Sequence, residues 1–336
     1  MSDKVNVVIP AVELNNELLK CLQEINKINY TNFFATIVLD YKSKQKLPKL
    51  KYKVKELIVG KINMSKKRNI AVKKFTSKYI AFIDSDAYPN KNWLKLAIRY
   101  LKNKNCHVVG GPGIPFPNQS GIEKICYYSK RSYFVTGYLN FRKYKAKKRY
   151  CDWLEACNLI MNRKFFLKYG GMDTKRYTAE DSEFFQRIQK KNPTLKVFYS
   201  PDLFIYHRER RMFGFFLQRF VFGMDFLTLL KFNSGLNGLQ PLLPILVFIS
   251  FLILLVSNID LASKIKIFSI FVILINMAIL FDITKYIKSF KTLIYTLVTI
   301  NIANISFALG GLATFMGLRK FLDNKIYLYS RKKNKH

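Results

Sequence analysis

The sequence predicts an α/β domain with a mostly parallel sheet and helices on both faces, followed by helices that enter a membrane. In the first two thirds of the 336 residues, short apolar runs alternate with stretches of helical periodicity, which is typical of strands joined by helical crossovers. The last third carries long apolar stretches with few charges. We therefore expect a domain at 1–207, an amphipathic interfacial segment at 208–236, a transmembrane region at 237–318 and a basic tail at 319–336.

The individual elements follow from the period of the apolar residues. The expected strands cover residues 5–9, 36–39, 54–59, 79–83, 108–113, 152–161 and 196–199. The expected helices cover residues 15–28, 63–75, 91–101 and 178–191, and residues 114–150 are expected to be less regular. Ligands of such sheets bind beyond the carboxyl ends of the strands, and Asp40, Asp84 and Asp86 stand at such ends.

The composition limits the partners. Lys and Arg total 57 against 21 Asp and Glu, a formal net charge of +36, which calls for an anionic surrounding such as nucleic acid or a cytoplasmic membrane leaflet. The apolar last third favours the membrane, so we expect anionic membrane lipids and no nucleic acid. The five cysteines form no CxxC pair, which argues against a disulfide framework and a zinc site.

The segment FIDSDAYPN (82–90) has the composition of a metal site. Asp84 and Asp86 are two residues apart after an apolar strand, so both carboxylates can face one crevice. Mg²⁺ and Mn²⁺ prefer oxygen ligands and share their shells with substrate phosphates. The neutral imidazole of His207 is a further candidate ligand. The alternatives are a polar turn for the two aspartates and a structural role for the histidine.

The segment YTAEDSEFFQRI (177–188) offers a general base. Asp181 is the candidate, because a carboxylate at a helix N-terminus is expected to have a depressed pKa and to stay ionised. It would accept the proton of an attacking hydroxyl group. The spacing of Thr178 and Asp181 equally fits a capping box that only starts the helix.

Four blocks in order resemble the family 2 glycosyltransferases, which have the GT-A fold and inverting chemistry. The resemblance covers roughly residues 4 to 223. The blocks are VNVVIP (5–10), KRNIAVKKFTSKYIAFIDSDAYPNKNWL (67–94), VVGGPG (108–113) and ACNLIMNRKFFLKYGGMDTKRYTAEDSEFFQRIQK (156–190).

On the donor side, the resemblance implies a nucleotide-diphosphate sugar bound with Mg²⁺ or Mn²⁺. Asp86 would bind the metal, and Asp84 would lie against the ribose or base beside it. Asp40 would contact the base. Arg68, in the Arg-Asn pair of the second block, joins this donor-binding set.

On the acceptor side, the resemblance implies that Asp181 is the catalytic base. Glu180 would support the acceptor or Asp181, and Asn158 would line the sugar pocket. The acceptor would be a lipid-linked or cell-surface glycan. Because the Gln-x-x-Arg-Trp of processive synthases is absent, we expect transfer of single sugars. The alternative is a non-catalytic membrane scaffold or lipid-binding protein that retains the fold.

The membrane region predicts a multi-pass protein of the cell membrane with a cytoplasmic catalytic domain. The apolar stretches at 240–257, 265–282 and 292–316 each approach or exceed the roughly 20 residues of a spanning helix, which gives about three spans. The lysine-rich loop 284–291 is expected to be cytoplasmic. Three spans would then place the basic tail outside, so the third stretch is either a span or a re-entrant segment.

Overall fold

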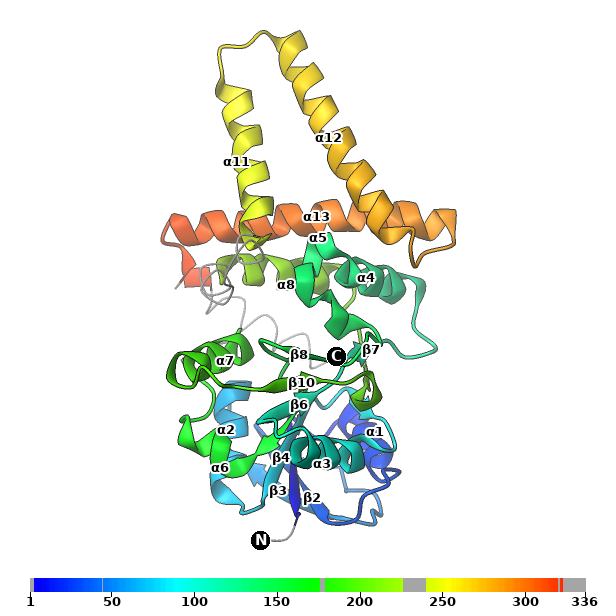
Figure 1. Cartoon of the computed structure of the whole chain (residues 1–336), viewed down its shortest axis with the longest axis vertical. Helices are drawn as coiled ribbons and strands as arrows, with labels where there is room; N and C mark the ends of the chain where they lie inside the picture. Colours follow the sequence, from blue (N-terminus) through cyan, green and yellow to red (C-terminus); the bar gives the residue numbers. More distant parts are fainter. Residues whose placement is uncertain (1–2, 44, 176–178, 226–239, 320, 323–336) are drawn as a thin grey trace. The chain divides into compact units, whose positions relative to one another are not determined.

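The computed structural model describes residues 3–43, 45–175, 179–225, 240–319 and 321–322, and these form two compact units (Figure 1). The first unit holds the described residues up to Phe116 together with Phe141–Arg208. The second holds Pro117–Asn140 and the described residues from Glu209 onward. The chain therefore changes units next to the boundary expected after residue 207, but the earlier segment 117–140 also joins the second unit.

The first unit is built on an eight-stranded sheet of order β3-β2-β1-β4-β9-β6-β10-β8. Strands β9 and β8 run antiparallel to their neighbours and the other six run parallel to one another, as a mostly parallel sheet requires. The strands are β1 (Val5–Pro10), β2 (Phe33–Leu39), β3 (Lys53–Ile58), β4 (Tyr79–Ile83), β6 (Val108–Gly110), β8 (Arg149–Cys151), β9 (Asn158–Asn162) and β10 (Val197–Tyr199).

Helices cover both faces of this sheet, as expected. Alternate residues of the central strands, such as Val7 and Ile9 of β1, share one apolar cluster with α1 and α3. On the opposite face, Phe82 of β4 packs against Phe166 of α6, which packs against Phe184 of α7. The helices of this unit are α1 (Asn16–Ile25), α2 (Met64–Lys74), α3 (Trp93–Asn103), α6 (Arg163–Lys168) and α7 (Glu180–Lys191), with a 3-10 turn η2 (Pro201–Leu203).

A second, three-stranded sheet has the order β5-β11-β7. Its strands are β5 (Ala87–Pro89), β7 (Gly113–Ile114) and β11 (Ile205–His207). Strand β11 runs antiparallel to β5 and pairs His207 with Ala87. This pairing joins two parts of the chain that are about 120 residues apart, and it places His207 beside the segment that follows β4.

The second unit is helical. Its helices are α4 (Gly121–Arg131), α5 (Tyr133–Thr136), α8 (Met212–Met224), α11 (Leu243–Val256), α12 (Leu261–Ile283) and α13 (Phe290–Phe315), with a 3-10 turn η3 (Gln240–Leu242) before α11 and another, η1 (Gly137–Lys143), after α5. The expectation of irregular structure at 114–150 was wrong over α4. There, Ser120 and Glu123 form a complete capping box that starts the helix.

Two helices in the described part of the chain, α12 and α13, are long and apolar enough to cross a membrane. Of the three stretches expected to span, the first forms the 3-10 turn η3 and the 14-residue helix α11, which together give 17 continuous residues, the lower limit for a spanning segment. In the expected interfacial segment, residues 212–224 form α8, and residues 226–236 lie outside the described part of the chain.

Candidate functional site

The acidic pair after β4 meets the end of β11. Strand β4 ends at Ile83, and Asp84 and Asp86 follow at the carboxyl edge of the sheet. His207 Nε2 lies 3.7 Å from Asp84 Oδ2 and 3.6 Å from Asp86 Oδ1. All three side chains are about one-third exposed, so a ligand can reach them. The structure thus gathers the three sequence-predicted metal residues in one place.

The surroundings shift the pKa values of Asp84 and Asp86 in opposite directions. Burial raises the pKa of Asp84, but His207 and Arg68 outweigh this and lower it to about 2. Burial raises the pKa of Asp86 above its usual value, and the charge of Asp84 adds to this while His207 opposes it. Asp84 is therefore the carboxylate that stays ionised most firmly, and Asp86 is the one that gains most from a nearby cation.

Cys157 is a neighbour that the sequence did not single out. Ligand atoms of Asp84, Cys157 and His207 all lie within 4.8 Å of one another. Burial, with the charges of Glu155 and Asp84, raises the pKa of the Cys157 thiol well above its usual value. A protonated thiol is a poor ligand for a hard cation. Its place directly before Asn158 was the only signal in the sequence.

The donor set fits a hard divalent cation. Two carboxylates and an imidazole offer oxygen and nitrogen atoms, which suit Mn²⁺ and, for the carboxylates, Mg²⁺. With bonds of about 2.1 Å, two ligand atoms of one ion lie at most about 4.2 Å apart. The distances from His207 to the two carboxylates are within that limit.

Arg68 links the acidic pair to α7. It lies on α2, which begins after the N-cap Asn63. Arg68 Nη2 donates to Asp84 Oδ1 at 2.9 Å, and Nη1 donates to Glu180 Oε1 at 3.0 Å. The Arg68 side chain is only 4% exposed, so this two-sided pair holds α7 at a fixed distance from β4.

Asp181 follows in the first turn of α7. Its carboxylate accepts from the backbone N–H of Ala156 at 3.2 Å. The expected depression of its pKa was wrong: burial, followed by the charges of Glu180 and Glu155, raises the pKa to about 7. These contributions outweigh the lowering of the pKa that was expected from the helix N-terminus. The helix begins at Glu180 with Ala179 as its N-cap, and Thr178 lies outside the described residues.

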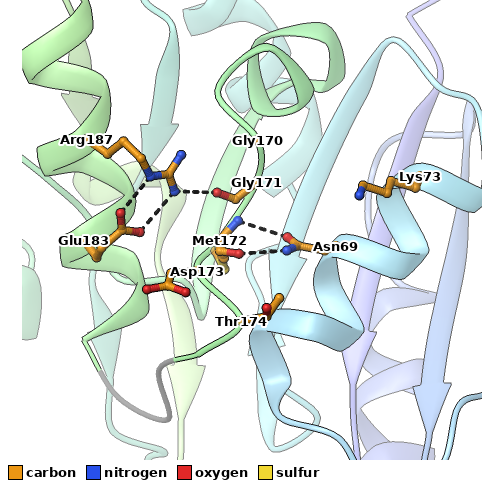
Figure 2. Close-up of a pocket in the computed structure, with 9 residues that line it drawn as sticks. All are labelled: Asn69, Lys73, Gly170, Gly171, Met172, Asp173, Thr174, Glu183 and Arg187. Carbon is orange, nitrogen blue, oxygen red and sulfur yellow. Dashed lines mark hydrogen bonds and ion pairs between the residues drawn. The ribbon is translucent and has the colours of Figure 1, made fainter.

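The loop before α7 is held in place from two sides (Figure 2). The Asn69 side chain of α2 bonds both the N–H and the carbonyl of Met172. Arg187 of α7 donates to the carbonyl oxygens of Tyr169 and Gly171. Gly171 has φ +75°, and a Cβ there would lie 2.6 Å from Asn69 Oδ1. These bonds fix residues 169–172 against both α2 and α7.

A cavity of about 360 Å³ lies at this loop. It contains none of the residues predicted from the sequence to bind donor, metal or acceptor. The residues that line it are Asn69, Lys73, Gly170, Gly171, Met172, Asp173, Thr174, Glu183 and Arg187.

Asp40 and Asn158 are more deeply buried than the acidic pair. Asp40 Oδ1 lies 2.6 Å from Lys67 Nζ, and both side chains are at most 1% exposed. Asn158 accepts from Trp93 Nε1 at 2.9 Å and donates to the carbonyl oxygens of Gly111 and Leu203. In this structure, Asp40 neutralises Lys67, and the amide of Asn158 joins β9 to three other segments.

Comparisons with known proteins bear on the family and the fold of this chain. Residues 6–170 match the model of the family described as glycosyl transferase family 2. A stretch of 128 residues is 28% identical to poly(ribitol-phosphate) beta-N-acetylglucosaminyltransferase TarS of Staphylococcus aureus, covering 33% of this chain and 22% of TarS. The match therefore spans about a fifth of that relative's length.

Two solved structures are similar. The mannosyltransferase PcManGT from Pyrobaculum calidifontis, in complex with GDP-Man and Mn²⁺, has a TM-score of 0.57 at 13% identity, over 92% of this chain and 86% of PcManGT. It shares the fold. Residues 1–349 of Staphylococcus aureus TarS, in complex with UDP-GlcNAc, give a TM-score of 0.46 at 17% identity, over 94% of this chain and 92% of that one.

Proposed function

Because this chain belongs to the family 2 glycosyltransferases through its GT-A domain, we propose that it moves one sugar from a nucleotide-diphosphate sugar to a lipid-linked or membrane-proximal glycan. The transfer inverts the anomeric centre and uses Mg²⁺ or Mn²⁺. Asp181 is the general base, and the catalytic domain lies on the cytoplasmic side of the cell membrane.

One observation carries the proposal: Arg68 joins the acidic pair to the start of α7. The pair with Asp84 is at 2.9 Å and the pair with Glu180 at 3.0 Å. A donor phosphate site and a base must face the same sugar carbon for one displacement to occur. A rigid bridge between the two candidate groups meets that need.

The residues divide the reaction between them. Asp84, Asp86 and His207 would hold the cation, which supplies Lewis-acid stabilisation of the leaving diphosphate. The acceptor oxygen forms a bond to the anomeric carbon as the bond to the diphosphate oxygen breaks. Asp181 takes the acceptor's hydroxyl proton, and a pKa of about 7 suits a base that works near neutral pH.

The membrane location has its own support. Helix α12 is 23 residues long, and only 6% of its most apolar stretch is buried. The exposed face carries large apolar side chains, including Ile270, Leu274 and Phe281. An apolar surface of this kind is stable in lipid and costly in water. An acceptor held in the membrane would be presented to the enzyme at the same surface.

The test is a donor screen with the full chain in lipid nanodiscs. A panel of nucleotide sugars that includes GDP-mannose and UDP-N-acetylglucosamine is incubated with Mg²⁺ or Mn²⁺ and a membrane glycolipid extract as the source of acceptor hydroxyls, and release of the nucleoside diphosphate is measured. We expect release with one donor, and loss of it when the cation is chelated. No release with any donor under either cation would overturn the proposal.

The matched variants are Asp181→Asn and Glu56→Gln. Asp181→Asn removes only the base, so transfer should fall by about 10²–10⁴-fold while the donor still binds. Glu56 is exposed on the edge strand β3, so Glu56→Gln should leave transfer unchanged. Full activity of Asp181→Asn would remove Asp181 from the mechanism.

A further inference from the structure

Helix α13 has two unlike faces, although its composition resembles that of a spanning helix. Of its most apolar stretch, 39% is buried, against 6% for α12. The buried face carries mostly small residues and threonines, with Ile300 and Phe307 as its large apolar members. The opposite face is apolar and exposed, with Ile294, Val298, Ile302, Ile305 and Leu309 at helical spacing. A helix with one lipid-facing stripe is typical of the membrane interface.

The buried face of α13 runs along α8 in the same direction. Near the start of α8, Thr299 Oγ1 lies 3.9 Å from Met212 Sδ. Farther on, Arg219 stacks over the ring of Phe307 at 4.8 Å. Past the ends of both helices, Arg319 pairs with Asp225.

Glycines make this contact close. A Cβ on Gly223 of α8 would overlap the carbonyl oxygen of Phe307, and a Cβ on Gly310 of α13 would overlap that of Phe220. Two helices in such contact along their length share one orientation. Helix α8 has only 13 residues, about 20 Å, so it cannot cross a bilayer. Helix α13 must then lie parallel to α8 and likewise not cross the bilayer.

Polar contacts at the C-terminal end of α12 indicate the depth in the membrane at which α8 and α13 lie. Asp282, one residue before α12 ends, accepts from Ser132 Oγ at 2.7 Å and from the N–H of Tyr133 at 2.9 Å. Lys130 and Glu209 pair nearby in the sequence, at 2.6 Å. Such polar groups belong at the headgroup level. Helices α4 and α5, which carry these groups, also contact α13.

The hairpin of α11 and α12, unlike α8 and α13, has the geometry of a segment that crosses the bilayer. Figure 1 shows the two helices joined at one end and spreading apart toward the other, with α13 lying across their far ends. At 23 residues, α12 is about 35 Å long, which matches a bilayer core of about 30 Å. Charged residues gather at the far tip, where Asp260 caps α12 and Lys264 follows.

The charges at the two ends of α13 agree with this arrangement. Lys285, Lys288 and Lys291 stand at its start, and Arg319 follows its end. A crossing helix would put one of these basic ends on each side of the membrane. A helix lying in the interface keeps both on the side that basic segments favour.

We propose that α8 and α13 form one layer in the plane of the membrane interface and that only the α11–α12 hairpin crosses the bilayer. The membrane is then crossed twice, and the basic C-terminal tail lies on the same side as the GT-A domain. The inference rests on the proposed membrane location and is independent of the proposed sugar transfer.

The test is cysteine labelling of the full chain in intact cells with a membrane-impermeant maleimide. Asn258→Cys places a thiol in the connection between α11 and α12, and Asn334→Cys places one in the tail. The unsubstituted chain is the control, since its own cysteines are buried or half-buried. We expect label on Asn258→Cys alone in intact cells, and label on the tail cysteine only after permeabilisation.

The other outcomes overturn the proposal. Label on Asn334→Cys in intact cells would mean that α13 crosses the membrane. Absence of label on Asn258→Cys in intact cells, with label after permeabilisation, would mean that the hairpin does not cross. Neither result depends on activity, so each is separate from a failed donor screen.

Discussion

Different interactions stabilise the interior of each of the two units. In the first, buried ions meet: Lys67 pairs with Asp40 with both side chains at most 1% exposed, and Arg68 stands between two carboxylates. In the second, α8 and α13 meet where Gly223 and Gly310 let backbone touch backbone. The ion pair of Arg319 with Asp225 lies past the ends of those helices rather than between them.

The difference follows from the role proposed for each unit. Buried charges are costly, yet a site for a diphosphate and a cation needs charged groups in fixed positions. Between helices in lipid, apolar surface gives no net drive to associate, so close van der Waals contact takes its place. The first unit should therefore be sensitive to lost charge, and the second to added volume.

The largest expected effect is that of Lys67→Met. The substitution keeps an apolar side chain of similar length and leaves Asp40 buried without its counter-charge. We expect the free energy of unfolding of the first unit to fall by about 3–5 kcal/mol. Both tryptophans, Trp93 and Trp153, are buried in this unit, so tryptophan fluorescence in urea reports on it alone.

Two further variants complete this measurement. Lys66→Met changes the exposed neighbour and should leave the transition in place. The double variant Lys67→Met with Asp40→Asn should regain much of the loss, because no charge is then left unpaired. If Lys67→Met alone unfolds at the same urea concentration as the natural chain, buried charge does not hold this unit together.

The next effect is that of Gly223→Ala in the second unit. The added methyl group meets the carbonyl of Phe307, so α8 and α13 must move apart. We expect a loss of about 1–3 kcal/mol, which is usual for overpacking. It should be visible as earlier loss of the helical circular dichroism signal, with the tryptophan transition unchanged.

Gly214→Ala is the matched control on the same helix. A Cβ there meets only the side chain of Arg210, at 3.6 Å. Alanine is the better helix former by up to about 1 kcal/mol, so this variant should be neutral or slightly more stable. Equal behaviour of the two variants would contradict the close contact of α8 with α13.

Local signals made much of the first unit predictable. The expected strand at 79–83 matches β4, and the helices at 15–28 and 63–75 contain α1 and α2. The N-cap residues Asn15 and Asn63 accept bonds from the helices they start, which is information carried within four residues. The carboxylates after β4 could be placed because parallel strands end at one edge of the sheet.

Other features depend on contacts between distant residues. His207 reaches the acidic pair only because the three-residue strand β11 pairs with β5. Lys67 is one of many lysines, and only burial distinguishes it from Lys66. Both α12 and α13 are apolar enough to span a membrane, with mean hydropathies of 2.2 and 1.6, and the packing of α13 on α8 is what separates them.

The smallest effect tests the site itself through pH. Burial, with the charges of Glu180 and Glu155, raises the pKa of Asp181 to about 7. A base must be deprotonated, so transfer should fall about tenfold for each pH unit below 7 and level off above it.

Glu155→Gln sharpens that pH test. Glu155 is bonded to Lys143, and the substitution removes a negative charge near Asp181. With less repulsion, the charged form of Asp181 is favoured, so its pKa falls and the acid limb of the rate profile moves to lower pH. The measurement is kcat/KM between pH 5 and 9 for both chains. A midpoint that stays in place or rises would mean that another group sets the acid limb, because removal of a negative charge can only make Asp181 a stronger acid.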